Sequence, residues 1–317
     1  MEGMSASRSA RPHALGVQGS RMGAVAVLSA VSIWGVTNTL VKLSHLSALS
    51  FAVYRLGLGA VVLFGALLVS RRRLTLPQIR AALPAGVLFG VQIVFWFGAL
   101  KHTSLVDATM ISALQPALVL LVAGRMFGEH AARRDVLLTL ASLVGVAVVT
   151  FGSAGTPAWS LGGDLLAVAS LLGWTAYMLL SKRVRDRVPP LQYMAVVFLI
   201  AAVLVLPIAL VAGAPLGGVR TTDWLILLVF VIGASSGHVL LAWAHSSVDV
   251  SLSSTLLLAQ PVLTAVAALL ILGEPIPVLA VVGGAVVLGS LGAVVRHPRS
   301  PALRRSSSRQ TSLDRAR

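Results

Sequence analysis

Two stretches of the sequence decide its fold, because they repeat one pattern. Residues 99–129 read ALKHTSLVDATMISALQPALVLLVAGRMFGE, and residues 242–274 read AWAHSSVDVSLSSTLLLAQPVLTAVAALLILGE. Each contains an Ala-x-x-His-x-Ser pattern, then a Gln-Pro pair, then a Gly-Glu pair whose glutamate lies thirteen residues after the proline. Self-similarity at a fixed distance indicates a duplicated structural unit. The chain is therefore expected to consist of two related halves.

The match continues toward the N-terminus. Gly90 and Gly233 correspond in the same register, and Trp34 and Trp174 are each followed eight residues later by a lysine. The offset between corresponding positions stays at about 140–145 residues, which is room for five membrane-spanning helices. Matches in the same order at a nearly constant offset favour duplication over coincidence.

The composition is that of a membrane protein. Of the 317 residues, 57% are hydrophobic and only 11% are charged, and the mean hydropathy is +0.91. Soluble globular proteins carry about 25% charged residues, so this chain lacks the side chains for a water-facing surface. A spanning helix needs about 20 residues, so ten helices with short loops would use nearly all of it. The sequence predicts an all-α, polytopic membrane protein.

Apolar runs separated by short polar breaks predict ten transmembrane helices. A backbone within the bilayer must satisfy its own hydrogen bonds, which makes runs of this length helical. The tails 1–21 and 296–317 are expected to be cytoplasmic, the first disordered and the second basic. The expected spans are about 22–42, 49–69, 81–100, 106–126, 136–152, 163–181, 191–212, 223–244, 251–272 and 277–295.

The basic residues predict the orientation of these spans. If both termini are cytoplasmic, 21 of the 25 Lys and Arg residues lie on the cytoplasmic side. The exceptions are Lys42, Lys101, Arg55 and Arg220. This asymmetry follows the positive-inside rule and predicts a multi-pass protein of the plasma (inner) membrane. The net charge of +15 is therefore interpreted as a topology signal, and no nucleic-acid partner is expected.

The two repeats are expected to be inverted with respect to each other. Five is an odd number, so the second copy must enter the membrane from the opposite side. The loops agree, because RRRLTLPQIR after the second span is basic, whereas its counterpart GAPLGGVRTTD contains one arginine. Inverted repeats that meet near the midplane of the bilayer are the architecture of many secondary transporters.

On these residues the chain resembles the EamA family of the drug/metabolite transporter superfamily. The paired segments quoted above carry the resemblance, together with Ile33-Trp34-Gly35 in the first span, and the similarity covers residues 24–151 and 163–295. The resemblance implies two five-helix repeats around a central cavity. It also implies alternating-access transport of small metabolites, often amino acids or related compounds. Relatives among the small multidrug exporters carry a carboxylate in the middle of a span, and this sequence has none.

Two ionisable residues lie well inside the expected spans, and both are candidates for substrate contact. Arg55 lies about six residues into the second span, where it could meet a substrate carboxylate in a cavity or extend to the membrane surface. His238 lies in the eighth span, where it could relay a proton or pack as a neutral hydrogen-bonding group.

Neutral polar and aromatic side chains inside the spans complete the expected cavity lining. Buried amides need hydrogen-bond partners, and aromatic rings supply rigid apolar walls with a polar edge. The alternatives are contacts between neighbouring helices and, for Trp243, a place in an interfacial belt. These candidates are Trp34, Asn38, Gln92, Trp96, Gln115, Trp174, Tyr177, Trp243 and Gln260.

The repeated Gln-Pro and Gly-Glu pairs are assigned structural roles. Pro116 and Pro261 are expected to interrupt or kink their helices, since proline lacks a backbone donor. Such interruptions form binding sites in transporters, although a purely architectural kink is the alternative. Glu129 and Glu274 end their spans, where a carboxylate is unfavourable for the helix dipole. A capping or ion-pairing role is expected for both, with gating as the alternative.

Other chemistry lacks support in the sequence. There is no cysteine, no His pair with metal-ligand spacing and no phosphate-binding Gly-rich loop. We therefore expect no metal, no cofactor and no enzymatic activity. The expected partners are a small-molecule substrate and the lipid bilayer, and a homodimer is neither predicted nor excluded. The predicted function is export of small polar metabolites, with multidrug-type efflux, a lipid-acting membrane enzyme and a non-transporting scaffold as alternatives.

Overall fold

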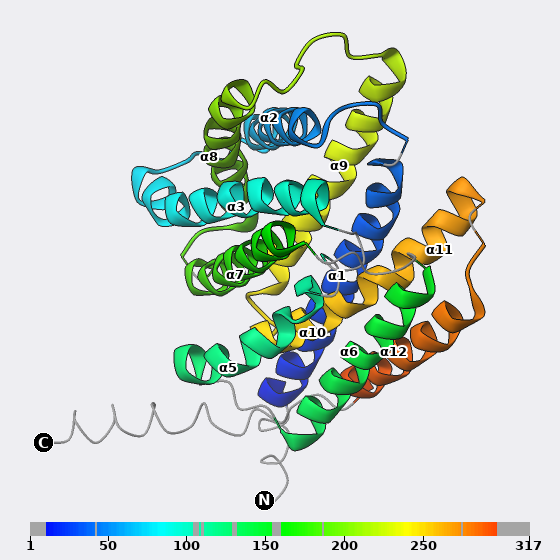
Figure 1. Cartoon of the computed structure of the whole chain (residues 1–317). Helices are drawn as coiled ribbons and strands as arrows, with labels where there is room; N and C mark the ends of the chain where they lie inside the picture. The colour runs from blue at the N-terminus through cyan, green and yellow to red at the C-terminus, as the bar shows by residue number, and fades with distance from the viewer. Residues whose placement is uncertain are drawn as a thin grey trace, which may run out of the picture.

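A computed structural model describes residues 11–41, 43–103, 108, 111–128, 132–153, 160–185, 187–273 and 275–296. Within these residues every regular element is a helix, and no strand occurs (Figure 1). The helices are α1 (Arg11–Val41), α2 (Ala48–Val69), α3 (Leu76–His102), α5 (Gln115–Phe127), α6 (Arg133–Ser153), α7 (Leu161–Val184), α8 (Pro190–Val211), α9 (Thr221–Ala244), α10 (Val250–Leu256), the 3-10 helix η1 (Leu257–Ala259), α11 (Gln260–Leu272) and α12 (Val278–Arg296).

Eight apolar helical segments in the described residues are long enough to cross a bilayer, and two shorter ones cover Arg21–Thr37 and Ile111–Phe127. Many large apolar side chains on these helices point away from the protein, such as Leu121, Val211 and Leu270. A helix can expose such a surface only where the surroundings are themselves apolar. The chain is a multi-pass membrane protein.

The first helix begins earlier than the sequence indicates. Residues 11–20 were expected to belong to a disordered tail, but α1 begins at Arg11 and runs without a break into the apolar segment. Pro12 occupies the second position of the helix, where its missing N–H costs no hydrogen bond. Between Pro12 and Val41 the helix contains no further proline, so nothing forces it to end before the apolar segment.

The repeated Gln-Pro to Gly-Glu pattern corresponds to one thirteen-residue helix in each half. α5 begins at Gln115 and α11 begins at Gln260, so Pro116 and Pro261 lie at the second helical position and not in a helix interior. Both helices end at a glycine in the left-handed conformation, Gly128 with φ 66° and Gly273 with φ 69°. Glycine adopts this helix-ending conformation at little cost. The spacing from the Gln-Pro pair to the Gly-Glu pair is equal in the two halves because it is the length of one helix that ends at a glycine.

The segments before these two helices lead into them directly. In the second half, α10 and the 3-10 helix η1 precede α11 without a gap, and Val250–Ile271 is one apolar helical segment. In the first half, Leu114 is a turn residue immediately before α5, within the apolar segment Ile111–Phe127. A 3-10 turn tightens a helix locally without ending it.

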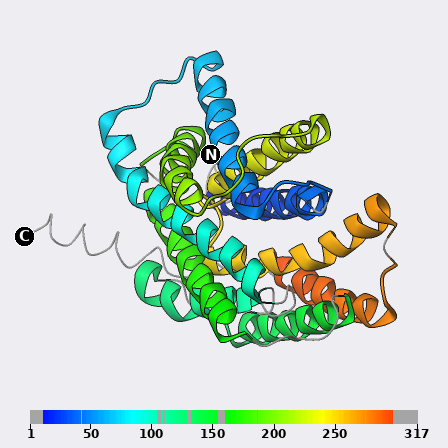
Figure 2. The same ribbon diagram turned by 45° about the horizontal axis from the view of Figure 1, so that its top comes forward.

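Helices of the two halves pack against each other throughout the molecule. α3 packs on α7 and α8, α1 packs on α9 and α11, and α2 packs on α8 and α9. The last helices of the halves, α6 and α12, lie side by side in both views (Figures 1 and 2). Most of the buried apolar side chains come from these shared interfaces.

Glycines mark the closest approaches between the halves. A Cβ on Gly163 of α7 would lie 2.5 Å from the carbonyl carbon of His102 at the end of α3. At the corresponding place in the other half, a Cβ on Gly23 of α1 would lie 2.6 Å from Ser247 Oγ. No real Cβ tolerates such distances, so both positions require glycine for the helices to meet.

Candidate functional site

Arg55 and His238 form a hydrogen-bonded pair between α2 and α9. Arg55 Nη2 lies 3.1 Å from His238 Nε2. His238 is 4% exposed, while Arg55 is half-buried. The guanidinium lies over the rings of Phe89 and Phe230, with its central carbon 6.0 and 5.4 Å from their centroids. Arg55 therefore turns into the protein and does not extend to the membrane surface.

Aromatic rings from four other helices surround the imidazole of His238. Its ring centroid lies 4.6 Å from that of Trp34 on α1, 5.1 Å from Phe89 on α3, 5.6 Å from Phe198 on α8 and 6.2 Å from Trp174 on α7. Trp34 and Trp174 also meet edge to face, with centroids 6.3 Å apart. We call Arg55, His238 and the rings around them the central cluster.

The positive charge of Arg55 has no carboxylate partner among the described residues. No Asp or Glu oxygen of that part of the chain lies within 4.0 Å of the guanidinium, and Arg55 Nε has no acceptor there. His238 Nδ1 is buried and likewise lacks an acceptor among these residues. A buried charge is costly unless it is paired, so the central cluster is suited to an anion with two hydrogen-bond acceptors.

Several predicted site residues adjoin the central cluster. The Trp34 indole donates to Ala234 O at 3.2 Å, and Gly237 leaves room for this ring, because a Cβ there would lie 2.5 Å from Trp34 Nε1. Tyr177 is 1% exposed and stacks on Trp174 and Phe89, and its hydroxyl donates to Met194 Sδ.

The predicted glutamines have diverse surroundings. Gln92 of α3 donates to Ser170 Oγ on α7 at 3.1 Å and remains half-buried. Gln115 is buried and donates to Met178 Sδ at 2.7 Å. Gln260 begins α11 and is half-buried. None of these three contacts Arg55 through a hydrogen bond in the described structure.

The remaining predicted residues lie apart or outside the described side chains. Trp96 is half-buried and packs against the small cluster of buried Ala99, Ala108 and Ala167. Trp243 is 37% exposed, and its ring contacts none of the rings of the central cluster. The side chain of Asn38 lies outside the described residues, as do Glu129 and Glu274, for which capping and gating stay predictions.

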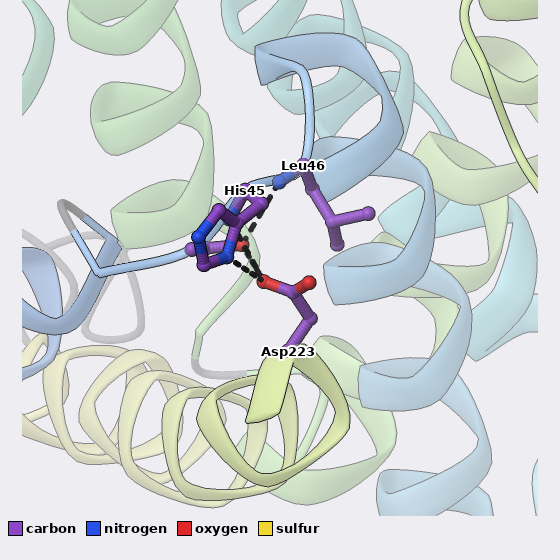
Figure 3. Close-up of polar contacts among 4 residues, drawn as sticks. His45, Leu46 and Asp223 are labelled. Atoms are coloured by element: carbon purple, nitrogen blue, oxygen red, sulfur yellow. Dashed lines mark hydrogen bonds and ion pairs between the residues drawn. The ribbon is translucent and has the colours of Figure 1, made fainter. Parts of the chain in front are cut away.

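A second polar site lies at one end of the bundle, where α1 connects to α2 and α8 connects to α9. Asp223, in the first turn of α9, is 1% exposed and accepts hydrogen bonds from Ser44 Oγ at 2.9 Å and from the His45 backbone N–H at 2.8 Å (Figure 3). The His45 imidazole lies 3.8 Å from the same carboxylate oxygen. Asp223 and His45 line a pocket of about 190 Å³ together with residues of the loop between α8 and α9. We call this region the Asp223 end.

Further bonds at the Asp223 end join the two halves. Ser50 Oγ donates to Pro215 O at 2.6 Å, and the Tyr54 hydroxyl donates to Leu216 O. The Tyr54 ring also meets Trp224 edge to face at 5.3 Å. The loop between α8 and α9 is thus fixed on the beginning of α2.

The opposite end of α9 carries a cationic network. Lys182 Nζ donates to His245 O at 2.7 Å and to Val248 O at 2.6 Å, which ties α7 to the connection after α9. His245 Nδ1 shares a hydrogen bond with Ser181 Oγ at 3.2 Å. We call this region the Lys182 end.

Comparison with known proteins identifies the family. The model of the EamA-like transporter family matches residues 21–151 and 161–296. The chain belongs to this family. The two matched segments correspond to the two halves described above. The resemblance inferred from the paired Gln-Pro segments is confirmed.

Known relatives of this EamA-like transporter are named as transporters. It is 28% identical over 282 residues to the uncharacterized transporter YyaM of Bacillus subtilis, with 84% of this chain and 92% of that protein aligned. An uncharacterized transporter of Archaeoglobus fulgidus is 23% identical over 272 residues, covering 84% and 96%. A solved crystal structure, described only as that of a protein, shares the fold with a TM-score of 0.74 at 22% identity, covering 88% of this chain and 99% of that one.

Sequence reasoning missed several residues of the site in this EamA-like transporter. Phe89, Phe198 and Phe230 surround the Arg55–His238 pair, but phenylalanine inside an apolar run carries no sequence signal of its own. Asp223 was not among the predicted site residues. Its position in a first helical turn, where negative charge is favourable, was the available indication.

The stability of this EamA-like transporter is expected to fall as the pH drops below about 6.5. Burial, assisted by the charges of Lys182 and Arg185, lowers the pKa of His245 from 6.5 to about 3. Below pH 6.5 the unfolded chain binds this proton and the folded protein does not, so protonation favours unfolding. At pH 5 the loss is about 2 kcal/mol.

Thermal unfolding in detergent between pH 5 and 8 measures this effect. His245→Gln should lessen the decline in the unfolding temperature, and the exposed His45→Gln should leave it unchanged. An equal slope in wild-type protein and His245→Gln would contradict the assignment.

Proposed function

We propose that this protein is a secondary transporter that exports small carboxylate-bearing metabolites, such as amino acids or related polar compounds, by alternating access. The observation that carries the proposal is Arg55, a cation inside the helical bundle without a carboxylate partner among the described residues. A substrate carboxylate would pair with this guanidinium through charge-assisted hydrogen bonds. The same charge repels lipophilic cations, which separates the proposal from multidrug-type efflux.

The packing of the helices supports inverted repeats. By their order in the two halves, α1, α2, α3, α5 and α6 correspond to α7, α8, α9, α11 and α12. If each helix is exchanged with its counterpart, the α3–α7 contact becomes α9–α1, α3–α8 becomes α9–α2, and α1–α11 becomes α7–α5. All of these contacts occur. The contacts α6–α12 and α2–α8 exchange with themselves. The Gly163 and Gly23 approaches exchange as well. A two-fold relation between five-helix units accounts for this pattern.

In the proposed topology ten segments cross the inner membrane, including the two shorter apolar ones. The ninth crosses as one helical segment, Val250–Ile271, that contains the 3-10 turn η1. Both termini are cytoplasmic, which follows from the distribution of Lys and Arg. The Lys182 end is then cytoplasmic, and the Asp223 end faces the outside.

Alternating access requires contacts between the halves that break when one end opens. The bonds of Asp223 with Ser44 and His45, and of Ser50 with Pro215, join residues of the first half to residues of the second. They hold the Asp223 end together in this structure. In the proposed cycle they separate when the site faces outward, which releases the substrate.

Counterflow in proteoliposomes tests the proposed function. Vesicles loaded with unlabelled compound are diluted into labelled alanine, glutamate or gluconate, and ethidium entry is measured in parallel. Accumulation of at least one carboxylate above protein-free vesicles is expected, with no protein-dependent entry of ethidium. Transport of ethidium alone would overturn the substrate class, and no counterflow of any carboxylate would overturn the proposal.

A further inference from the structure

We propose that the substrate carboxylate occupies the central cluster together with one proton, and that His238 takes up this proton. The inference rests on the proposed function, because it concerns the ion that accompanies the substrate through the same site. Export together with a proton is then driven by the outward gradient of the substrate. It arises from the hydrogen-bond roles that Arg55 imposes on His238 and from the groups around the pair.

The tautomer of His238 follows from its partner. A guanidinium has only donors, so in the 3.1 Å contact Arg55 Nη2 donates and His238 Nε2 accepts. The imidazole is therefore neutral, and its single hydrogen lies on Nδ1. In the described structure this buried N–H has no acceptor. The empty site thus holds one cation and one unsatisfied donor beside it.

The side chains packed around His238 in the described structure are uncharged apart from Arg55. The charge of Arg55 therefore governs protonation of the imidazole. The facing side chains are Trp34 from α1, Phe89 from α3, Trp174 from α7 and Phe198 from α8. Tyr177 lies behind two of them, packed on Phe89 and Trp174. The rings of tryptophan and phenylalanine do not titrate, and the Tyr177 hydroxyl donates to Met194 Sδ. None of the described side chains facing the imidazole is a carboxylate.

Protonation of His238 is unfavourable in the empty site and favourable in the loaded one. An imidazolium has no lone pair, so it cannot accept from Arg55, and it places a second cation beside the guanidinium. A carboxylate at the pair reverses both effects, because its two oxygens accept from Arg55 and from the imidazolium. Carboxylate binding and proton uptake therefore favour each other, and the coupling is reciprocal.

In the proposed coupling, the net charge of the site is the same with and without the bound carboxylate and proton. The empty site carries one positive charge, from Arg55. With a bound monocarboxylate and a protonated His238 it again carries one, and the proton comes from the water on the side from which the substrate enters. On release, the carboxylate and the proton leave together. Gluconate would cross without net charge, whereas zwitterionic alanine would carry one positive charge.

The test is net uptake of labelled alanine and gluconate at pH 6, 7 and 8, into vesicles that contain a pH-sensitive dye and no substrate, so that every proton that enters with a carboxylate is detected. For wild-type protein we expect apparent affinity to rise up to tenfold per unit decrease in pH, and one proton to move with each carboxylate. His238→Gln provides an amide oxygen that can accept from Arg55, and we expect it to lose the pH dependence of affinity. His102→Gln, an exposed histidine at the end of α3, should retain it.

The outcomes separate the two proposals. Carboxylate flux without proton movement in wild-type protein, or a full pH dependence in His238→Gln, would overturn the coupling and leave the proposed function intact. Absence of carboxylate counterflow in wild-type protein would overturn both. Because the wild-type proton measurement needs no variant, poor folding of His238→Gln would not prevent a decision.

Discussion

Replacing Arg55 by methionine is expected to reduce carboxylate counterflow at least a hundredfold, to the level of protein-free vesicles. Methionine fills much of the same volume but provides no donor and no charge. The guanidinium has His238 as its hydrogen-bond partner and two phenylalanine rings as its walls, so the surrounding helices do not depend on an ion pair with it. Loss of one charged hydrogen-bonding group from a buried site typically costs about 2–5 kcal/mol of binding.

Two further variants make the Arg55 result specific. Arg55→Lys keeps the charge but loses the planar pair of donors, and it should retain weak transport with poorer apparent affinity. Arg80→Met removes an exposed arginine near the start of α3 and should transport like wild-type protein. Wild-type rates in Arg55→Met would show that the substrate does not contact this residue.

Gly283→Val is expected to abolish correct folding of the protein. A Cβ on Gly283 of α12 would lie 2.6 Å from Gly145 O and 2.7 Å from Val149 N, both backbone atoms of α6. Backbone cannot rotate aside as a side chain can, so the two helices must separate along their whole contact. Overpacking of this kind costs about 3 kcal/mol or more, which is a large part of the stability of a typical domain.

Gly289→Val is the matched control, because it lies on the same helix and a Cβ there meets nothing within 4 Å. Size-exclusion chromatography in detergent and the thermal unfolding temperature measure the effect. Gly283→Val should elute as aggregate or unfold at much lower temperature, and Gly289→Val should match wild-type protein. Normal behaviour of Gly283→Val would contradict the close contact between α6 and α12.

The sequence predicted an all-helical, multi-pass membrane protein correctly, because this class follows from local composition. The Gln-Pro pairs and the Gly-Glu pairs were recognised as matching positions, and the structure explains them as the two ends of one short helix. The predicted start of the first helix was wrong, because residues 11–20 are too polar to look like part of a membrane span. They nevertheless continue the helix, because nothing in them stops it.

The central cluster was predictable in part. Arg55 and His238 were selected because ionisable side chains are costly inside a bilayer, yet their contact joins residues 183 positions apart. Trp34 and Trp174 were recognised as counterparts, but their mutual contact depends on how the halves dock. Trp243, by contrast, shares its residue type with them and lies on the exposed side of α9. Residue type selects candidates, and helix rotation decides which of them meet.

The contact between Trp34 and Trp174 has a consequence for the transport cycle. Trp34 and Trp174 are counterparts in the two repeats. If the repeats exchange conformations, the contact between these two rings is therefore the same before and after the exchange. The same holds for the contact between α6 and α12, the last helices of the two halves. The α3–α8 and α2–α9 interfaces would instead trade places. In the proposed motion, the tryptophan pair and the α6–α12 contact then stay fixed. Distances measured across them should stay constant while the other helices move.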